Sequence, residues 1–138
     1  MEESPYREDA CLMTPETIAR FLADVSLFHE MPQGQLVTLA SKAKVMFFPR
    51  GSVIFRIGDH PNWIYFLYEG YVTEFVSYGS SVSVIVKTRR EHDYIGEMAI
   101  LSGLPYTNTA MAMGDVTAIA FSKETLLDIM KQHYHVSH

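Results

Sequence analysis

The chain has 138 residues, of which 48% are hydrophobic, and carries a formal net charge of −5. This length suits one domain that buries about two thirds of its unfolded surface, and the apolar content excludes a disordered chain. The single cysteine excludes an internal disulfide framework, and no apolar run approaches the ~20 residues that a transmembrane helix needs.

The N-terminal part of the chain holds the whole charge imbalance. The first 30 positions contain seven acidic and two basic residues, whereas the remaining positions contain nine of each. Because no basic stripe results, we expect this domain not to bind nucleic acid by itself. Residues 1–13 are predicted to form an acidic, flexible segment ahead of a single domain over 14–138. The acidic start lacks the basic region of a signal peptide, and Cys11 fits a reducing cytoplasm, where we expect the protein to reside.

Two short helices are predicted next. Thr14 can cap a helix that has Pro15 at its first position, and Pro32 can begin a second one. The expected inward residues are Ile18, Phe21, Leu22 and Val25 in the first segment and Leu36, Leu39 and Ala40 in the second.

From Ala43 to Phe121 the apolar pattern changes to period two and to residues that favour strands. Glycine-containing turns separate the predicted strands, which are marked by Val53/Phe55, Ile64/Phe66, Val72 and Val82/Val84/Val86. Many short strands at close spacing are typical of an antiparallel sandwich or roll.

Within this β-rich region, residues 93–112 carry the strongest functional signal. Gly96 and Glu97 begin one short apolar helical turn, and a loop with Gly103 and Pro105 follows. The start of a helix presents unpaired N–H groups and a partial positive charge, which suits an anion such as a phosphate. Glu97 can accept hydrogen bonds from sugar hydroxyls, although it can also cap its own turn. The segment therefore predicts a site for phosphate and ribose.

A closing helix is predicted after Ser122, which can cap it. Its apolar residues fall on one side of the helix and are Leu126, Leu127, Ile129 and Met130. No pair of histidines is spaced as metal ligands on a strand, so we expect no metal site. No nucleophile with a base and no paired carboxylates occur at a catalytic spacing, so we expect no enzyme activity.

Segments Gly96 to Leu101 and Pro105 to Ala110 resemble the phosphate-binding cassette of cyclic-nucleotide-binding domains. Phe48 to Phe55 and Ile64 to Val72 resemble the early hairpin and the central strand of the same family, and roughly residues 18 to 133 fit it. The family includes catabolite-activator-type regulators, regulatory subunits of cyclic-nucleotide-dependent kinases and gated channels. The resemblance implies a mainly β fold: an antiparallel β-roll (double-stranded jelly-roll) with N-terminal helices, a short cassette helix and a C-terminal helix.

The resemblance also implies a function and a site. We expect a regulatory domain, excised from a larger transcription regulator or signalling protein, that binds cAMP or cGMP and relays binding through its C-terminal helix. No cofactor is expected, and a homodimer would form through that helix or a missing downstream segment. The implied ligand-binding residues are Gly96, Glu97, Met98, Ala99, Tyr106, Thr107 and Val86. For Val86 and Met98, plain core is the default expectation, with a place in the ligand wall as the alternative.

One departure from the family pattern affects the ligand. The residue after the cassette proline is usually an arginine that pairs with the cyclic phosphate, but here it is Tyr106, which is uncharged near neutral pH. Tyr106 can bond a phosphate weakly, stack on a purine or fill the pocket. Lys87, Arg89 and Arg90 can supply the charge or can form a solvated hairpin end. The alternative function is a re-purposed domain for another ligand, or a degenerate interaction module.

Overall fold

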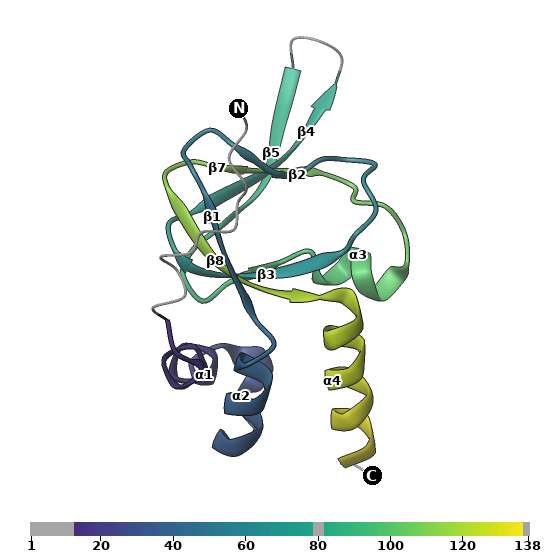
Figure 1. The fold of residues 1–138 in the computed structure, drawn as a ribbon. Coiled ribbons are helices and arrows are strands. Elements are labelled where there is room, and N and C mark those ends of the chain that lie inside the picture. The colour runs from purple at the N-terminus through teal and green to yellow at the C-terminus, as the bar shows by residue number, and fades with distance from the viewer. Residues whose placement is uncertain (1–12, 79–81, 137–138) are drawn as a thin grey trace.

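Two four-stranded antiparallel sheets form the body of the protein, with strand orders β1-β8-β3-β6 and β2-β7-β4-β5 (Figure 1). The computed structural model describes residues 13–78 and 82–136. The strands are β1 (Lys44–Phe48), β2 (Val53–Phe55), β3 (Trp63–Glu69), β4 (Val72–Tyr78), β5 (Val82–Arg89), β6 (Tyr94–Ile95), β7 (Thr109–Ala112) and β8 (Val116–Ser122). This arrangement is the predicted antiparallel β-roll, so the expected fold class is confirmed.

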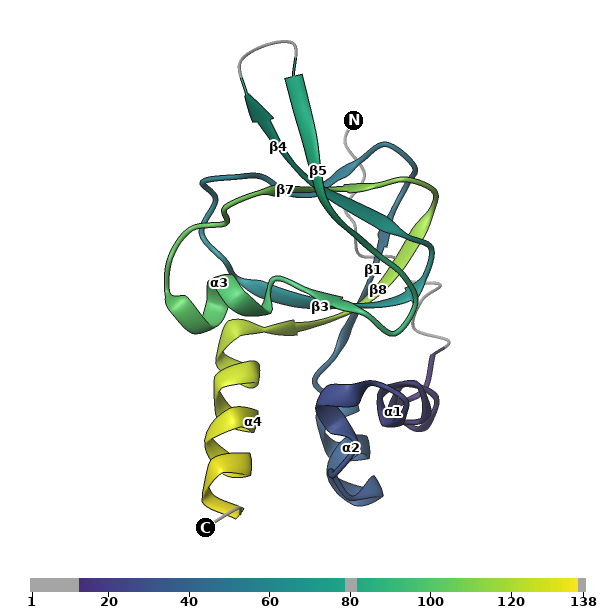
Figure 2. The same cartoon turned by 180° about the vertical axis from the view of Figure 1, so that it is seen from behind.

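The helices are α1 (Pro15–Ala23), the 3-10 turn η2 (Ser26–Phe28), α2 (Gln33–Ala40), α3 (Glu97–Ser102) and α4 (Lys123–Val136). α1 begins as predicted, because the Thr14 hydroxyl accepts a hydrogen bond from the Thr17 N–H at 3.1 Å. The Ser122 hydroxyl likewise accepts from the Thr125 N–H at the start of α4. Figure 2 shows α1, α2 and α4 on the β3 and β8 side of the roll, away from the β4–β5 hairpin.

The β1-β8-β3-β6 sheet has a buried core on each of its faces, which explains its continuous apolar strands. Ile64 and Phe66 pack on the helices, whereas the alternating Tyr65 and Leu67 point into the roll. The helical cluster also includes Ile100 of α3 and Leu126 of α4. The short cassette helix and the C-terminal helix therefore share one core.

Two sequence predictions about buried residues can be compared with this fold. Val25 is buried as expected, but it follows α1 instead of belonging to it. On α4, Leu126 is buried, while Leu127 and Met130 are exposed, so the expected apolar side is only partly covered. The predicted flexible segment 1–13 lies outside the described residues except for Met13, and it stays a prediction. No helix among the described residues is long and apolar enough to cross a membrane.

Candidate functional site

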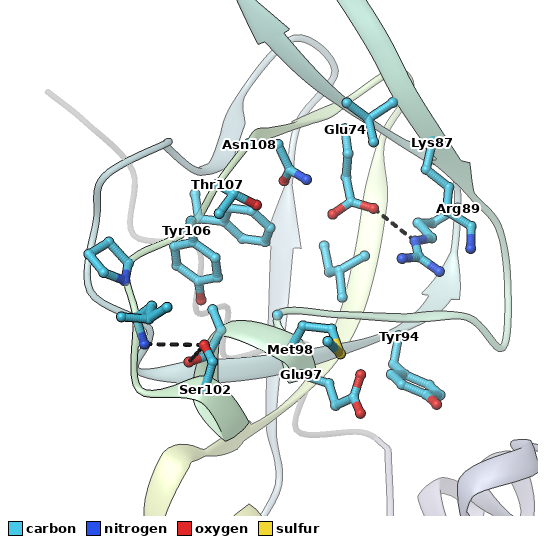
Figure 3. Close-up of a pocket in the computed structure, with 17 residues that line it drawn as sticks. Glu74, Lys87, Arg89, Tyr94, Glu97, Met98, Ser102, Tyr106, Thr107 and Asn108 are labelled. Carbon is cyan, nitrogen blue, oxygen red and sulfur yellow. Dashed lines mark hydrogen bonds and ion pairs between the residues drawn. The ribbon is translucent and has the colours of Figure 1, made fainter.

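A pocket of about 590 Å³ opens between α3 and the β4–β5 hairpin (Figure 3). Its volume falls in the range of roughly 300–1,000 Å³ that is common for small-molecule sites. The structure brings together all seven predicted site residues in the lining of this pocket: Val86, Gly96, Glu97, Met98, Ala99, Tyr106 and Thr107. Their contact with a ligand remains a prediction.

Gly96 fixes where α3 starts. Its φ of +94° is a left-handed conformation that favours glycine. A Cβ at this position would lie 2.9 Å from the backbone oxygen of Trp63, so only glycine lets α3 approach β3 this closely. Ile100, which is 2% exposed, anchors the other side of the short helix in the helical core. The cassette helix is therefore held both at its N-cap, Gly96, and at its middle, Ile100.

Glu97 follows directly and lines the pocket. The residue is half-buried, and its carboxylate makes no hydrogen bond or ion pair with any described residue. The alternative role as a cap of its own turn is not observed, because the start of α3 has no side-chain cap. The carboxylate is therefore available to accept hydrogen bonds from a ligand.

Val86 and Met98 are not core residues, which corrects the default expectation from the sequence. Val86 is 55% exposed on the edge strand β5, and Met98 is 73% exposed on α3. Both line the pocket. For Val86, the alternation of apolar residues along β5 predicts burial. However, β5 is an edge strand, and both Val84 and Val86 are exposed on it.

Tyr106 is buried in the roll with only 6% exposure. Its ring stacks on Phe55, with the ring centroids 3.8 Å apart and the planes 7° from parallel. Its hydroxyl donates to the Trp63 carbonyl oxygen at 3.3 Å. Burial, reinforced by the neighbouring Tyr65 and Asp59, raises the pKa of Tyr106 well above its usual value. The position that usually carries an arginine in the family is therefore neutral and already bonded to the protein.

The polar residues after Tyr106 divide between the scaffold and the pocket. The Thr109 hydroxyl accepts from the Ile57 N–H at 3.1 Å, and the Gly58 N–H donates to the Tyr106 carbonyl at 2.8 Å, which ties this loop to the early hairpin. Thr107 is exposed at the pocket, and its side chain has no hydrogen-bond partner among the described residues. Asn108 also lines the pocket.

Sequence reasoning missed an ion pair in the pocket. The Arg89 Nε donates to Glu74 Oε2 at 2.8 Å, and the two side chains are 27% and 8% exposed respectively. Both residues line the pocket. One signal could have revealed Glu74: it lies two positions after Val72, which is fully buried, so a charged residue occupies an inward position of β4.

The pocket therefore has two chemically different sides, which we name the apolar wall (Phe55 and Tyr106) and the charged wall (Glu74, Lys87 and Arg89). Figure 3 shows Tyr106 and Thr107 on one side and the three charged residues on the other. With Glu97 on α3, the lining carries two acidic and two basic residues. Such a lining has no excess of either charge and suits a ligand that has both a negative group and hydroxyl groups.

Among residues 13–78 and 82–136, no three histidine, cysteine, aspartate or glutamate side chains are placed to hold a metal ion. His133, His135 and Cys11 have no described side chains.

Comparison with protein families gives a match over residues 45–133 to the family described as the cyclic nucleotide-binding domain. Among curated proteins, the chain is similar to the cAMP-dependent protein kinase regulatory subunit of Dictyostelium discoideum, with 33% identity over 111 residues. That alignment covers 78% of this chain and 32% of the relative, so the chain spans about a third of the relative's length.

Two solved structures share the fold. The regulatory domain of Toxoplasma gondii PKA, crystallised with cAMP, superposes with a TM-score of 0.80 at 22% identity, covering 89% of this chain and 48% of that one. The regulatory subunit of a cAMP-independent protein kinase A from Trypanosoma cruzi, bound to guanosine, superposes with a TM-score of 0.74 at 22% identity, covering 80% of this chain and 39% of that one.

Proposed function

Because the chain belongs to the cyclic nucleotide-binding domain family, we propose that it is a sensing domain that binds cAMP or cGMP in the pocket between α3 and the β4–β5 hairpin. The observation that carries this proposal is Glu97, whose half-buried carboxylate lies free at the first position of α3 and lines the pocket. In this role Glu97 accepts the ribose hydroxyl hydrogen bonds. The first-turn N–H groups of α3 and the Thr107 hydroxyl donate to the cyclic phosphate.

Binding is relayed, in this proposal, through the shared helical core. Ile100 of α3 and Leu126 of α4 belong to one buried cluster, so a shift of the cassette helix changes the packing of the C-terminal helix. The Lys123 N–H donates to the Asn62 carbonyl at 2.9 Å, which fixes the first residue of α4 and leaves the rest as the moving part. Dimerisation through α4 or a downstream segment and a cytoplasmic location remain predictions.

A neutral nucleoside is the second candidate ligand. Tyr106 favours it, because the usual partner of the phosphate is replaced by an uncharged, buried side chain. The guanosine bound to the Trypanosoma cruzi relative supports the same candidate. The pocket remains open beside the Phe55–Tyr106 stack, so Tyr106 does not fill it, and a degenerate module without a ligand has less support.

A thermal-unfolding panel followed by calorimetry tests the proposal. The probes are cAMP, cGMP, adenosine and guanosine, each against the native chain and Glu97→Ala, with the exposed Glu30→Ala as a matched control. A ligand at a hundred times its Kd stabilises the native state by about 2.7 kcal/mol, which raises the Tm by several degrees. We expect Glu97→Ala to lose most of this stabilisation and Glu30→Ala to keep it.

The panel also separates the candidates. Stabilisation by a cyclic nucleotide supports the first candidate, and stabilisation by nucleosides alone supports the second. If no probe raises the Tm of a folded native chain, nucleotide sensing is wrong and an interaction module becomes the better account. The fluorescence of Trp63, the only tryptophan in the sequence, tests the relay, because Trp63 pairs with Ser122 next to α4.

A further inference from the structure

We propose that Arg89 is the residue that pairs with the negatively charged phosphate of the ligand, with Glu74 as the residue that positions it. This inference rests on the proposed function, since it names the phosphate partner within the same pocket. It assigns to β5 the charge that the cassette lacks at Tyr106.

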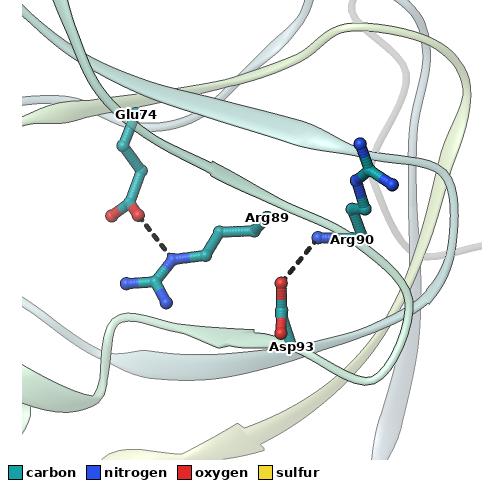
Figure 4. A network of polar contacts seen from close by, with 4 residues as sticks. All are labelled: Glu74, Arg89, Arg90 and Asp93. Atoms are coloured by element: carbon teal, nitrogen blue, oxygen red, sulfur yellow. Dashed lines mark hydrogen bonds and ion pairs between the residues drawn. The ribbon is translucent and has the colours of Figure 1, made fainter.

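Two cationic residues line the pocket, Lys87 and Arg89, and both come from β5. Arg90 does not line it, although it is adjacent in sequence. Figure 4 shows the Arg90 side chain directed away from the Glu74–Arg89 pair, while the Arg90 backbone N–H donates to Asp93 Oδ2 at 2.8 Å. Lys87 and Arg89 lie two positions apart on β5 and share one face of the strand, whereas Arg90 follows the end of β5.

Arg89 has donors to spare. A guanidinium carries five N–H donors, and the contact with Glu74 uses the one on Nε. The Nη1 and Nη2 groups make no hydrogen bond with any described residue. Their fork geometry matches the paired oxygens of a phosphate, which an arginine binds with two parallel hydrogen bonds. The Nε group of Arg89 is therefore bonded to Glu74, and its Nη1 and Nη2 groups remain available to a ligand in the pocket.

Glu74 explains why the guanidinium stays at the pocket. Arg89 is directly opposite Val72 in the antiparallel β4–β5 pair, so it lies on the same inward face as Val72 and Glu74. A carboxylate that is only 8% exposed needs a charged partner, and the chain supplies Arg89. Lys87 is opposite Glu74 in the same ladder, which leaves the charged wall with one net positive charge. An anion is therefore favoured at this wall.

The test compares Arg89→Gln with Arg90→Gln, a matched substitution at the neighbouring position outside the pocket. Calorimetric titrations use cAMP and cGMP as charged probes and adenosine and guanosine as neutral ones. Losing a charged partner of a bound phosphate weakens affinity about thirty-fold or more. We expect this loss for Arg89→Gln with the cyclic nucleotides, a change below threefold with the nucleosides, and no change for Arg90→Gln with any probe.

A second variant guards against a folding artefact. Arg89→Gln leaves Glu74 as a buried charge without a partner, whereas Glu74→Gln/Arg89→Gln replaces the pair with two neutral amides. The double variant should show the same loss of cyclic-nucleotide affinity as the single one. If the native chain binds cyclic nucleotides and the folded double variant binds them equally well, the assignment of Arg89 is wrong while the proposed function stands. If the native chain binds only nucleosides, or binds nothing, the assignment fails together with the cyclic-nucleotide proposal.

Discussion

The apolar wall and the charged wall of the pocket reverse the arrangement that the cassette sequence leads one to expect. In the apolar wall, Tyr106 occupies the position after the cassette proline, yet it is buried, stacked on Phe55 and bonded to a backbone carbonyl. In the charged wall, Arg89 comes from a strand that precedes the cassette and retains free donors. Under the proposed assignment of Arg89, the charge of the site is carried by β5 and not by the cassette whose motif identifies the site.

Among the substitutions considered, Phe55→Ala in the apolar wall should cause the largest loss of stability. Phe55 is 5% exposed and forms the stacking surface for Tyr106, so its removal leaves a cavity in the roll. We expect the free energy of unfolding to fall by about 3–5 kcal/mol, measured by urea denaturation. The double variant Glu74→Gln/Arg89→Gln should cost far less, because it removes both charges together, Glu74→Gln is nearly isosteric, and the shortened Arg89 side chain is partly exposed. Equal losses in the two variants would show that the walls do not differ in their structural role.

Gly96→Ala tests the attachment of the cassette helix, which lies between the walls. The new Cβ would meet the Trp63 oxygen at 2.9 Å and would also be strained by the positive φ. We expect the free energy of unfolding to fall by about 2–4 kcal/mol, and we expect a smaller rise in Tm when a ligand is added. Gly103→Ala is the matched control: its φ is +72° but no atom lies within 4 Å of the added Cβ, so only the conformational cost of about 1–2 kcal/mol applies. A larger loss at Gly103 would contradict the proposed close contact.

Tyr106→Arg sharpens the comparison by placing a charge in the apolar wall. We expect cyclic-nucleotide affinity to rise about tenfold, or about 1.4 kcal/mol, because a second cation then faces the phosphate. The same substitution should restore cAMP binding to Arg89→Gln, measured by calorimetry, and should leave the affinity for the neutral guanosine unchanged. Unchanged affinity in a folded Tyr106→Arg variant would mean that the phosphate does not lie beside this wall.

Tyr106→Phe should have the smallest effect at neutral pH. It removes one partly buried hydrogen bond to Trp63 while keeping the ring stack, so we expect a loss of about 0.5–1.5 kcal/mol and no change in ligand affinity. A several-fold loss of affinity would show that the hydroxyl contacts the ligand directly.

Tyr106→Phe should also change how the free energy of unfolding depends on pH above pH 10. Burial raises the pKa of Tyr65 to about 12, and that of Tyr106 is raised as well, so both tyrosines stay protonated in the native state above pH 10 while the unfolded chain loses these protons. Their contribution to stability is complete below pH 10 and is lost as the pH rises through the native-state pKa values. Unfolding free energies from pH 8 to 11 should therefore fall less steeply for Tyr106→Phe than for the native chain.

Much of the fold follows from local signals in the sequence. Thr14 and Ser122 predict two helix starts, because their hydroxyls can accept first-turn N–H bonds, and the glycine before Glu97 predicts the start of α3. The seven predicted site residues line one pocket because most of them are contiguous in the cassette. These inferences succeed where the relevant contact spans only a few residues along the chain.

The remaining features depend on contacts between distant segments. Stacking of Phe55 on Tyr106 joins positions 51 residues apart in sequence, and no local pattern shows that the tyrosine is turned into the roll. The alternation of apolar residues around Val86 correctly predicts a strand. It does not show that this strand lies at the edge of the sheet, where Val86 is exposed. The Glu74–Arg89 pair depends on the register of β4 against β5, which includes an irregularity after Glu74.

The most direct test of the central claim is a calorimetric comparison of each cyclic nucleotide with its own nucleoside on the native chain. The two members of a pair differ by the cyclic phosphate, so the ratio of their Kd values measures what the phosphate contributes. The account predicts that cAMP or cGMP binds at least about tenfold more tightly than adenosine or guanosine, a difference of about 1.4 kcal/mol or more. Equal affinities, or tighter binding of the nucleoside, would contradict a charged wall that recognises phosphate.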